Sequence, residues 1–194
     1  MKKLAREDLY SLEKYATLRN EFRSEVMEHK RDRRLPLGRN VTLYFEDRLT
    51  MQYQIQEMLR IERIFEADEV ESELEAYNPL IPDGSNWKAT FMVEFPDVAE
   101  RLEKLRQLVG IENQVWMQIG ESAKVYAIAD EDMKRADEQK TSAVHFLRFE
   151  LDPQQVAALK EGAPLAAGID HDKYRVEVRP VPDHVRRALL ADLD

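Results

Sequence analysis

The pattern of hydrophobic and polar positions in residues 45–65 predicts a helix at the centre of the chain. This stretch contains neither Pro nor Gly, and Asp47 is suited to cap its first turn. At helical spacing its apolar residues fall on two nearly opposite faces, which is typical of a helix packed between two layers. The first face carries Met51, Ile55, Met58, Ile61 and Phe65, and the second carries Leu49, Tyr53 and Ile64.

Three polar side chains of this helix, Arg48, Gln54 and Glu62, lie on or beside its first apolar face. A buried polar group needs a partner, because leaving one unpaired costs about 1–3 kcal/mol. Two interpretations stay open. In the first, these residues form a structural network in which Arg48 contacts a carboxylate and Gln54 contacts the backbone. In the second, the face lines a ligand pocket.

The segments around the central helix predict further elements of the N-terminal half. Residues 8–33 predict a long helix with one apolar stripe, 41–45 a short strand or an extended lead-in, and 66–77 an acidic, exposed helix. The connector 78–86 contains Asn-Pro and Pro-Asp-Gly turns. We interpret it as a plain connector or, alternatively, as the rim of a site, which makes Asn78 a candidate ligand-binding residue.

From residue 87 onward the pattern changes to an alternation of period two. Residues 87–95, 115–119, 123–128, 143–151, 163–169 and 174–178 predict strands, and 97–110, 152–160 and 182–193 predict helices. The polar residues 130–140 predict a short helix or a loop. Together these elements predict an α+β fold, with a mostly antiparallel sheet in the C-terminal two thirds that is packed by the long N-terminal helices.

We expect a single domain over residues 1–194. Within it, residues 1–77 form a mainly helical part, and residues 87–194 form a sheet with intervening helices. We find no internal repeat and no low-complexity linker at which the chain would divide.

Composition narrows the functional classes. The chain contains no cysteine, which excludes disulfides, thiolate metal sites, Cys-ligated iron–sulfur clusters and a cysteine nucleophile. Charged residues occupy the start of the chain, where a signal peptide needs an apolar core, and no stretch approaches the roughly 20 apolar residues of a membrane span. We therefore expect a soluble, cytoplasmic protein with no membrane partner.

The net charge of −9 is unevenly distributed along the chain. Residues 1–44 carry 11 Lys and Arg against 7 Asp and Glu, whereas residues 45–151 carry 12 against 23. An acidic body repels nucleic acid, so that only the basic run 30–34 is a candidate contact. Cations also suit the end of a helix, and we favour a solvated helix end for this run. Nucleic-acid binding through Arg31–Arg34 stays the less favoured alternative.

His145 is the most informative histidine, because it shares an apolar strand face with Leu147 and Phe149. A buried imidazole needs a hydrogen-bond partner, and Glu62 or Gln54 is the partner that we expect. A structural core histidine is the favoured interpretation. If a metal is bound, His145 and Glu62 are the first pair to test, since imidazole and carboxylate suit zinc, iron or manganese. The cofactor, if any, stays unknown.

Several tracts resemble a bacterial family that is catalogued as a domain of unknown function. The resemblance covers nearly the whole chain, and its most specific part is Tyr-Asn-Pro-Leu-Ile-Pro at 77–82. The other tracts are Arg31–Arg34, Phe45–Arg48 with Thr50, Met51, Gln54, Glu57 and Met58, and His145–Phe149. The family has no established activity, cofactor or site, so that no residue roles follow from it. Similar proteins are often encoded near rubrerythrin-like and iron–sulfur redox proteins, which implies an accessory role in a redox or stress system.

Two functions stay open besides the less favoured binding of nucleic acid. The favoured one is a non-catalytic accessory or ligand-binding protein with a protein partner or a small ligand, because catalytic motifs such as Gly-x-Ser-x-Gly and Gly-x-Gly-x-x-Gly are missing. The alternative is an enzyme that depends on a metal or small ligand, with its site on the central helix. In that enzyme Glu62 is a base or ligand, Arg48 an anion clamp and His145 a ligand or acid–base group.

Overall fold

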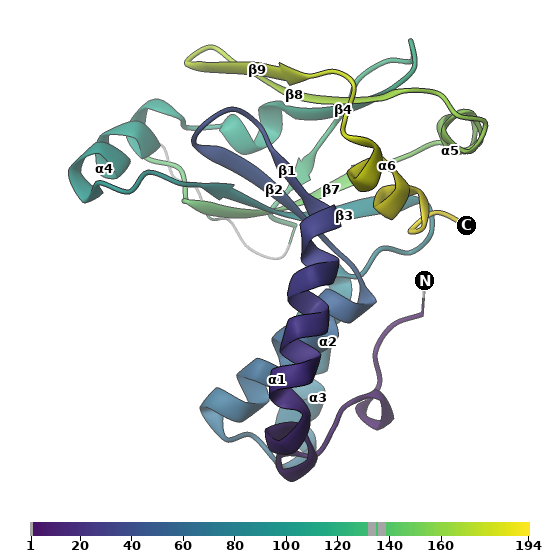
Figure 1. Ribbon diagram of the computed structural model, residues 1–194. Helices are drawn as coiled ribbons and strands as arrows, with labels where there is room; N and C mark the ends of the chain where they lie inside the picture. The colour runs from purple at the N-terminus through teal and green to yellow at the C-terminus, as the bar shows by residue number, and fades with distance from the viewer. Residues whose placement is uncertain (1, 132–134, 136–138) are drawn as a thin grey trace.

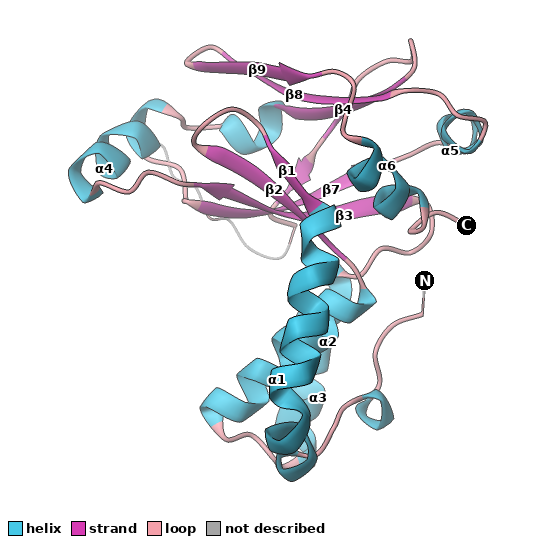
Figure 2. Cartoon of the chain, viewed as in Figure 1, coloured by secondary structure: helices cyan, strands magenta, loops and turns pink. Residues whose placement is uncertain are grey.

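The computed structural model describes residues 2–131, 135 and 139–194. Two antiparallel sheets form a body, from which three helices project as an arm (Figures 1 and 2). The predicted α+β class is confirmed. The helices are α1 (Leu12–His29), α2 (Arg48–Glu62), α3 (Ala67–Tyr77), α4 (Val98–Gln107), α5 (Pro153–Lys160) and α6 (Asp183–Leu190), and the 3-10 turns are η1 (Arg6–Asp8), η2 (Lys30–Arg33), η3 (Asn78–Leu80) and η4 (Ile111–Gln114).

The strands divide into two sheets, a division that the sequence did not predict. Sheet A has the order β1 (Arg34–Pro36), β2 (Val41–Glu46), β3 (Asn86–Val93), β7 (Val144–Glu150) and β6 (Ile128–Ala129). Sheet B has the order β5 (Val125–Tyr126), β4 (Val115–Ile119), β8 (Leu165–His171) and β9 (Tyr174–Val178). Each neighbouring pair is antiparallel. Residues 41–45, for which strand and lead-in were both open, form most of β2.

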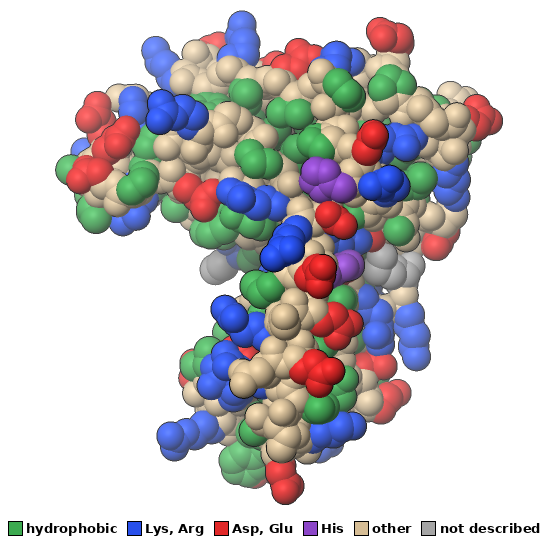
Figure 3. Space-filling view, viewed as in Figure 1, with side chains coloured by type: hydrophobic (Ala, Val, Ile, Leu, Met, Phe, Trp, Pro, Cys, Tyr) green, Lys and Arg blue, Asp and Glu red, His purple; other side chains and the backbone are tan. Residues whose placement is uncertain are grey.

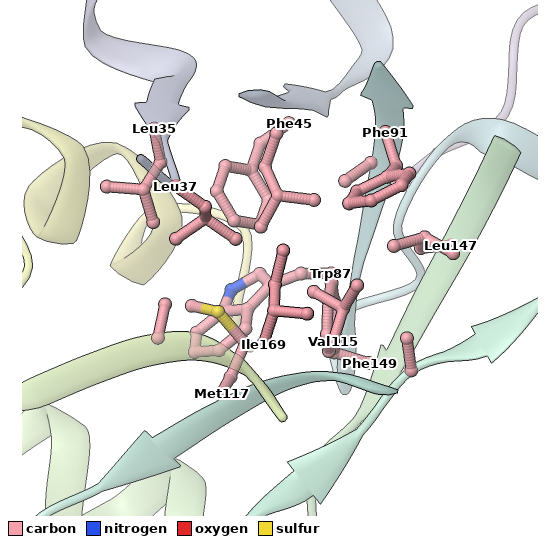
Figure 4. Packing of buried hydrophobic residues seen from close by; sticks show 14 of the residues in the cluster. Leu35, Leu37, Phe45, Trp87, Phe91, Val115, Met117, Leu147, Phe149 and Ile169 are labelled. Atoms are coloured by element: carbon pink, nitrogen blue, oxygen red, sulfur yellow. The ribbon is translucent and has the colours of Figure 1, made fainter. Parts of the chain in front are cut away.

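The main hydrophobic core lies between the two sheets (Figure 4). Alternation along β3 points Trp87 and Phe91 into this core and leaves Lys88 on the opposite, outer face of sheet A. The buried indole of Trp87 needs a polar partner, and its Nε1 donates a hydrogen bond to the carbonyl of Leu189 at 2.9 Å. This bond ties the C-terminal helix α6 to the centre of sheet A.

The arm consists of α1, α2 and α3 and appears as a narrow lobe below the body (Figure 3). The predicted first helix is shorter than expected, because Ser11 caps α1 and the chain tightens into η2 after His29. The capping of α2 by Asp47 is confirmed: its carboxylate accepts from the N–H of Thr50 at 2.9 Å. The predicted apolar face of α2 extends too far, since Ile61 is 59% and Phe65 69% exposed.

A buried ion cluster joins the arm to the body. Arg33 is 3% exposed and donates two hydrogen bonds to Asp192, at 2.5 and 2.9 Å. Its Nε also lies 2.9 Å from a carboxylate oxygen of Asp47. Burial opposes ionisation of Asp47, but a hydrogen bond from His29 and the charge of Arg33 keep the pKa of this carboxyl below its usual range. The interpretation of run 30–34 as a solvated helix end is therefore wrong for Arg33.

Two expectations from the sequence are not tested by the structure. The polar segment 130–140 lies largely outside the described residues, so that the choice between helix and loop stays open there. That the arm and body fold as one domain also stays a prediction. No helix within the described part of the chain combines the length and apolarity needed to cross a membrane.

Candidate functional site between the arm and sheet A

The outer face of sheet A places three charged residues in one row across neighbouring strands. Lys88 on β3 pairs in register with Glu46 on β2 and with Arg148 on β7. Because each of these residues alternates with a core residue on its strand, the sheet holds all three side chains on the side that faces the arm.

A pocket of about 280 Å³ lies between this row and the arm. One wall is apolar and comes from the end of α3 and from η3, and the other comes from β3, β7 and the residue after Asp130. The lining residues are Ala76, Tyr77, Pro79, Leu80, Lys88, Glu131, Phe146, Leu147 and Arg148. An apolar cavity with a few polar groups is typical of a site for a small molecule.

The Tyr-Asn-Pro-Leu run builds the apolar wall, and the N-terminal segment braces it. The Asn78 side chain accepts from the N–H of Leu4 at 2.8 Å and donates to the carbonyl of Leu4 at 2.9 Å. The Lys3 ammonium donates to the carbonyls of Asn78 and Ile81, each at 2.7 Å. The amide of Asn78, a predicted ligand-binding residue, thus holds the backbone of the wall rather than pointing a free group at a ligand.

Two charges of the row are compensated within the protein. The Arg148 guanidinium donates to both carboxylate oxygens of Glu131 at 2.8 Å and also to Glu150. The Glu46 carboxylate is buried and accepts hydrogen bonds from the hydroxyls of Thr50 at 2.6 Å and Thr90 at 2.7 Å.

Lys88 is the cation of the row that has no ion-pair partner among the described residues. No acidic side chain of the described residues forms an ion pair with its ammonium, and no described group accepts a hydrogen bond from it. Burial, and then the positive charge of Arg148, lower the pKa of Lys88 below its usual value. The negative charges of Glu131 and Asp83 act in the opposite direction and only reduce this shift. A half-buried ammonium without an acceptor is costly, so that this position favours either a bound anion or loss of the proton.

The predicted site residues of α2 do not form a common site. Arg48 and Glu62 lie at the two ends of this helix, about 21 Å apart along its axis at 1.5 Å per residue. Arg48 is held by Asp8 at 2.7 Å, and Glu62 is exposed. The buried glutamine of the helix is Gln56 rather than Gln54, which is only half-buried. Gln56 accepts a hydrogen bond from the N–H of Tyr10 at 2.6 Å.

His145 is buried as predicted, but the expected partners Glu62 and Gln54 are wrong. Its ring faces the core between the sheets, beside Phe91, whereas the arm lies against the outer face of sheet A. Its Nδ1 lies 2.5 Å from a carboxylate oxygen of Asp130, and its Nε2 lies 2.8 Å from the hydroxyl of Thr141. That hydroxyl also lies 3.1 Å from Glu112.

The His145 cluster satisfies its own polar groups. Asp130 has φ 51°, a left-handed conformation that is uncommon for a residue other than glycine, and this turn directs its carboxylate to the imidazole. Asp130 and Glu112 approach different ring nitrogens, and no three potential ligands are placed around one point within the described ranges. The cluster therefore stabilises the end of the core, and the proposed pairing of His145 with Glu62 at a metal has no geometric support.

Sequence reasoning missed Lys88, although a signal for it was present. Lys88 alternates with Trp87 and Ala89 in a strand whose other face is apolar, so that the sequence places it on the outer face. That Lys88 has no ion-pair partner depends on its register with Arg148 and Glu46, and the pattern within one strand does not reveal this register.

Comparisons with known proteins identify a family and a solved structure that are similar to this chain. A family model described as a protein of unknown function (DUF3501) matches residues 3–193. A solved crystal structure of a novel protein of unknown function from Burkholderia pseudomallei K96243 is 47% identical, with a TM-score of 0.94, and the similarity covers 100% of each chain. No protein with a curated description matches this chain significantly.

Proposed function

This chain belongs to the DUF3501 family, whose name assigns no activity, and we propose from its own geometry that it is a ligand-binding protein. The pocket between α3–η3 and sheet A takes a small organic anion with an apolar part. The observation that carries the proposal is Lys88, a half-buried ammonium that has no ion-pair partner among the described residues and lines a pocket whose opposite wall is apolar.

The division of the pocket into two walls supports an amphipathic ligand. Pro79 and Leu80 offer contact area to an apolar group, and burying such a group contributes about 25 cal/mol per Å² of apolar surface. An anionic group at the other side neutralises Lys88, and a hydrogen bond to a charged group contributes about 1.5–3 kcal/mol. Arg148 is already held by Glu131 and Glu150, so that Lys88 is the group that distinguishes an anion from a neutral ligand.

Other parts of the predicted function stay predictions. An accessory role near a redox or stress system, a protein partner and a cytoplasmic location agree with ligand binding and do not depend on it. The alternative enzyme with its site on α2 is less well supported, since Arg48 is held by Asp8 and lies a helix length from Glu62.

The test compares two probes of nearly the same shape, benzoate and neutral benzamide, by NMR chemical-shift titration of the labelled protein. We expect benzoate to bind about 10- to 100-fold more tightly than benzamide, because only benzoate carries a negative charge that can pair with the Lys88 ammonium. The shifted amides should belong to residues 76–80 and to β3.

Lys88→Met should remove the preference for benzoate, and Lys88→Arg should retain most of it. Lys173→Met, at the exposed turn between β8 and β9, is the matched control and should change nothing. Equal affinities for benzoate and benzamide, or equal benzoate binding by the wild type and Lys88→Met, would overturn the proposal.

A further inference from the structure

We infer that Lys88 is also an amine nucleophile, which takes a small aldehyde or ketone with an apolar substituent and holds it as an imine. This inference rests on the pocket of the proposed function but not on the charge of the ligand. It names a class of reaction and of substrate for the same site.

The first argument is the placement of the amine. Lys88 is fixed on β3, the central strand of sheet A, with β2 on one side and β7 on the other, and it is half-buried against the pocket. No described acidic group forms an ion pair with its nitrogen, and the nearby Glu131 carboxylate is held by Arg148, so that the nitrogen can face a bound molecule. An exposed lysine on a flexible loop would lack this fixed position.

The second argument is the neighbouring cation. Arg148 lies directly opposite Lys88, and like charges in this position on adjacent strands repel each other. Burial is the main cause that lowers the pKa of Lys88, and the charges of Arg148 and Lys3 act in the same direction. The carboxylates of Glu131 and Asp83 act in the opposite direction but do not reverse the shift, so that the fraction of neutral amine near neutral pH is increased. A lysine that is desolvated beside another cation is an established way to obtain a nucleophilic amine.

The third argument is the apolar wall. Tyr77, Pro79 and Leu80 face the same cavity, and they provide a surface for the substituent of the carbonyl compound. Holding the substituent there keeps the carbonyl carbon near the amine and reduces the entropy cost of the reaction.

The reaction is a condensation that needs no oxidant or reductant. The lone pair of Lys88 Nζ attacks the carbonyl carbon, and a carbon–nitrogen bond forms while the carbon–oxygen π bond opens. The carbonyl oxygen then leaves as water with the two hydrogens of the neutral amine. The product is an imine between Nζ and the former carbonyl carbon.

The test uses benzaldehyde with sodium cyanoborohydride at pH 7, which reduces an imine to a stable benzylamine. Peptide mass spectrometry then compares the rate of benzylation at each lysine of the folded chain. We expect Lys88 to react about tenfold faster than the exposed residues Lys160 and Lys173. A rate at Lys88 equal to or below the rates at those two residues would overturn the inference.

The pH dependence of the benzylation rate shows whether Lys88 reacts fast because its pKa is lowered or only because it is accessible to the reagents. Arg148→Gln removes the opposed cation, so the pKa of Lys88 should rise and the half-maximal rate of its benzylation should move to higher pH. An unchanged profile would contradict the role given to Arg148. Circular dichroism shows whether the variant is folded, and the benzylation rates of Lys160 and Lys173 in the same sample correct for the pH dependence of the reagents.

The two proposals fail in different ways. Benzoate binding that depends on Lys88 without selective benzylation would overturn the imine and leave the anion site intact. Selective benzylation without a preference for benzoate over benzamide would overturn the anion site and support the imine.

Discussion

Lys88 and Arg148 lie directly opposite each other on β3 and β7, so that two cations line one pocket from adjacent strands. Arg148 is bound by Glu131 and Glu150, whereas no described carboxylate forms an ion pair with Lys88. A half-buried ammonium without an ion-pair partner lowers the stability of the unliganded protein. Sites that lower stability in this way often serve a function, which here is binding or chemistry at Lys88.

The first prediction concerns the stability cost of this pair. Lys88→Met should raise the free energy of unfolding by about 0.5–1 kcal/mol, because it removes a half-buried charge and its repulsion by Arg148. Urea denaturation measures the change. Lys160→Met on the exposed face of α5 is the control and should stay within about 0.5 kcal/mol of the wild type. A destabilised Lys88→Met would show that the ammonium has a stabilising partner.

The second prediction concerns the buried histidine. His145→Ala should cost about 2–4 kcal/mol, because it removes a fully buried ring from the core and takes one hydrogen-bond partner from Asp130, which keeps its ion pair with Arg135 at 3.2 Å. Thermal and urea unfolding would measure this cost. His184→Ala, at an exposed position on α6, should be nearly neutral. A cost of about 1 kcal/mol or less at His145 would mean that water replaces the imidazole.

The third prediction concerns Gly168 on β8, which pairs in register with Trp116 on β4. A Cβ at Gly168 would lie 2.4 Å from the Trp116 ring and 2.5 Å from the backbone carbonyl of Val176. Because the carbonyl belongs to the neighbouring strand and has little freedom to move, Gly168→Ala should destabilise the protein by about 2–3 kcal/mol. Urea unfolding and the near-ultraviolet signal of tryptophan both report on this change.

A matched variant separates overlap from backbone strain. A Cβ at Gly110 would meet no atom within 4 Å, but its φ of 83° disfavours other residues. Gly110→Ala should therefore cost only about 1 kcal/mol. If Gly168→Ala were no more destabilising than Gly110→Ala, the strands of sheet B would not be packed as described.

The fourth prediction concerns acid stability of the arm. The Glu57 carboxylate accepts hydrogen bonds from Arg19 at 2.7 and 2.8 Å and from Tyr15 at 2.7 Å. The Arg19 hydrogen bond is the main cause that lowers the pKa of Glu57 to about 2, from an ordinary value of 4.5. A lowered pKa stabilises the folded state above the unfolded value, and this stabilisation is lost as pH falls from about 5 towards 2.

We therefore expect Glu57→Gln to be less stable than the wild type by about 1–2 kcal/mol at pH 6, and this difference to shrink below pH 4. Urea unfolding at several pH values measures it. Glu25→Gln, at an exposed position on α1, should show no such convergence. A difference between Glu57→Gln and the wild type that does not change between pH 6 and pH 3 would contradict the ion pair with Arg19.

Local features of the fold were predictable because their causes lie within a few residues. Asp47, Asp97 and Asp152 each accept a hydrogen bond from an N–H three residues later, and each begins a helix at the expected place. The alternation from Trp87 to Val93 likewise predicted which side of β3 is buried. The same reasoning erred at Phe65, because the end of α2 at Arg63 depends on a change of backbone conformation that has no apolar signature.

The sequence by itself determined the α+β class, the helix starts, the buried face of β3 and the burial of His145. Only the tertiary structure decided that the strands form two sheets, that Asp130 and Thr141 rather than Glu62 contact His145, and that Lys88 lines a pocket without an ionic partner. The reason is physical: caps and alternation act between neighbours in the chain, whereas partners across strands and layers depend on register and on the order of the strands.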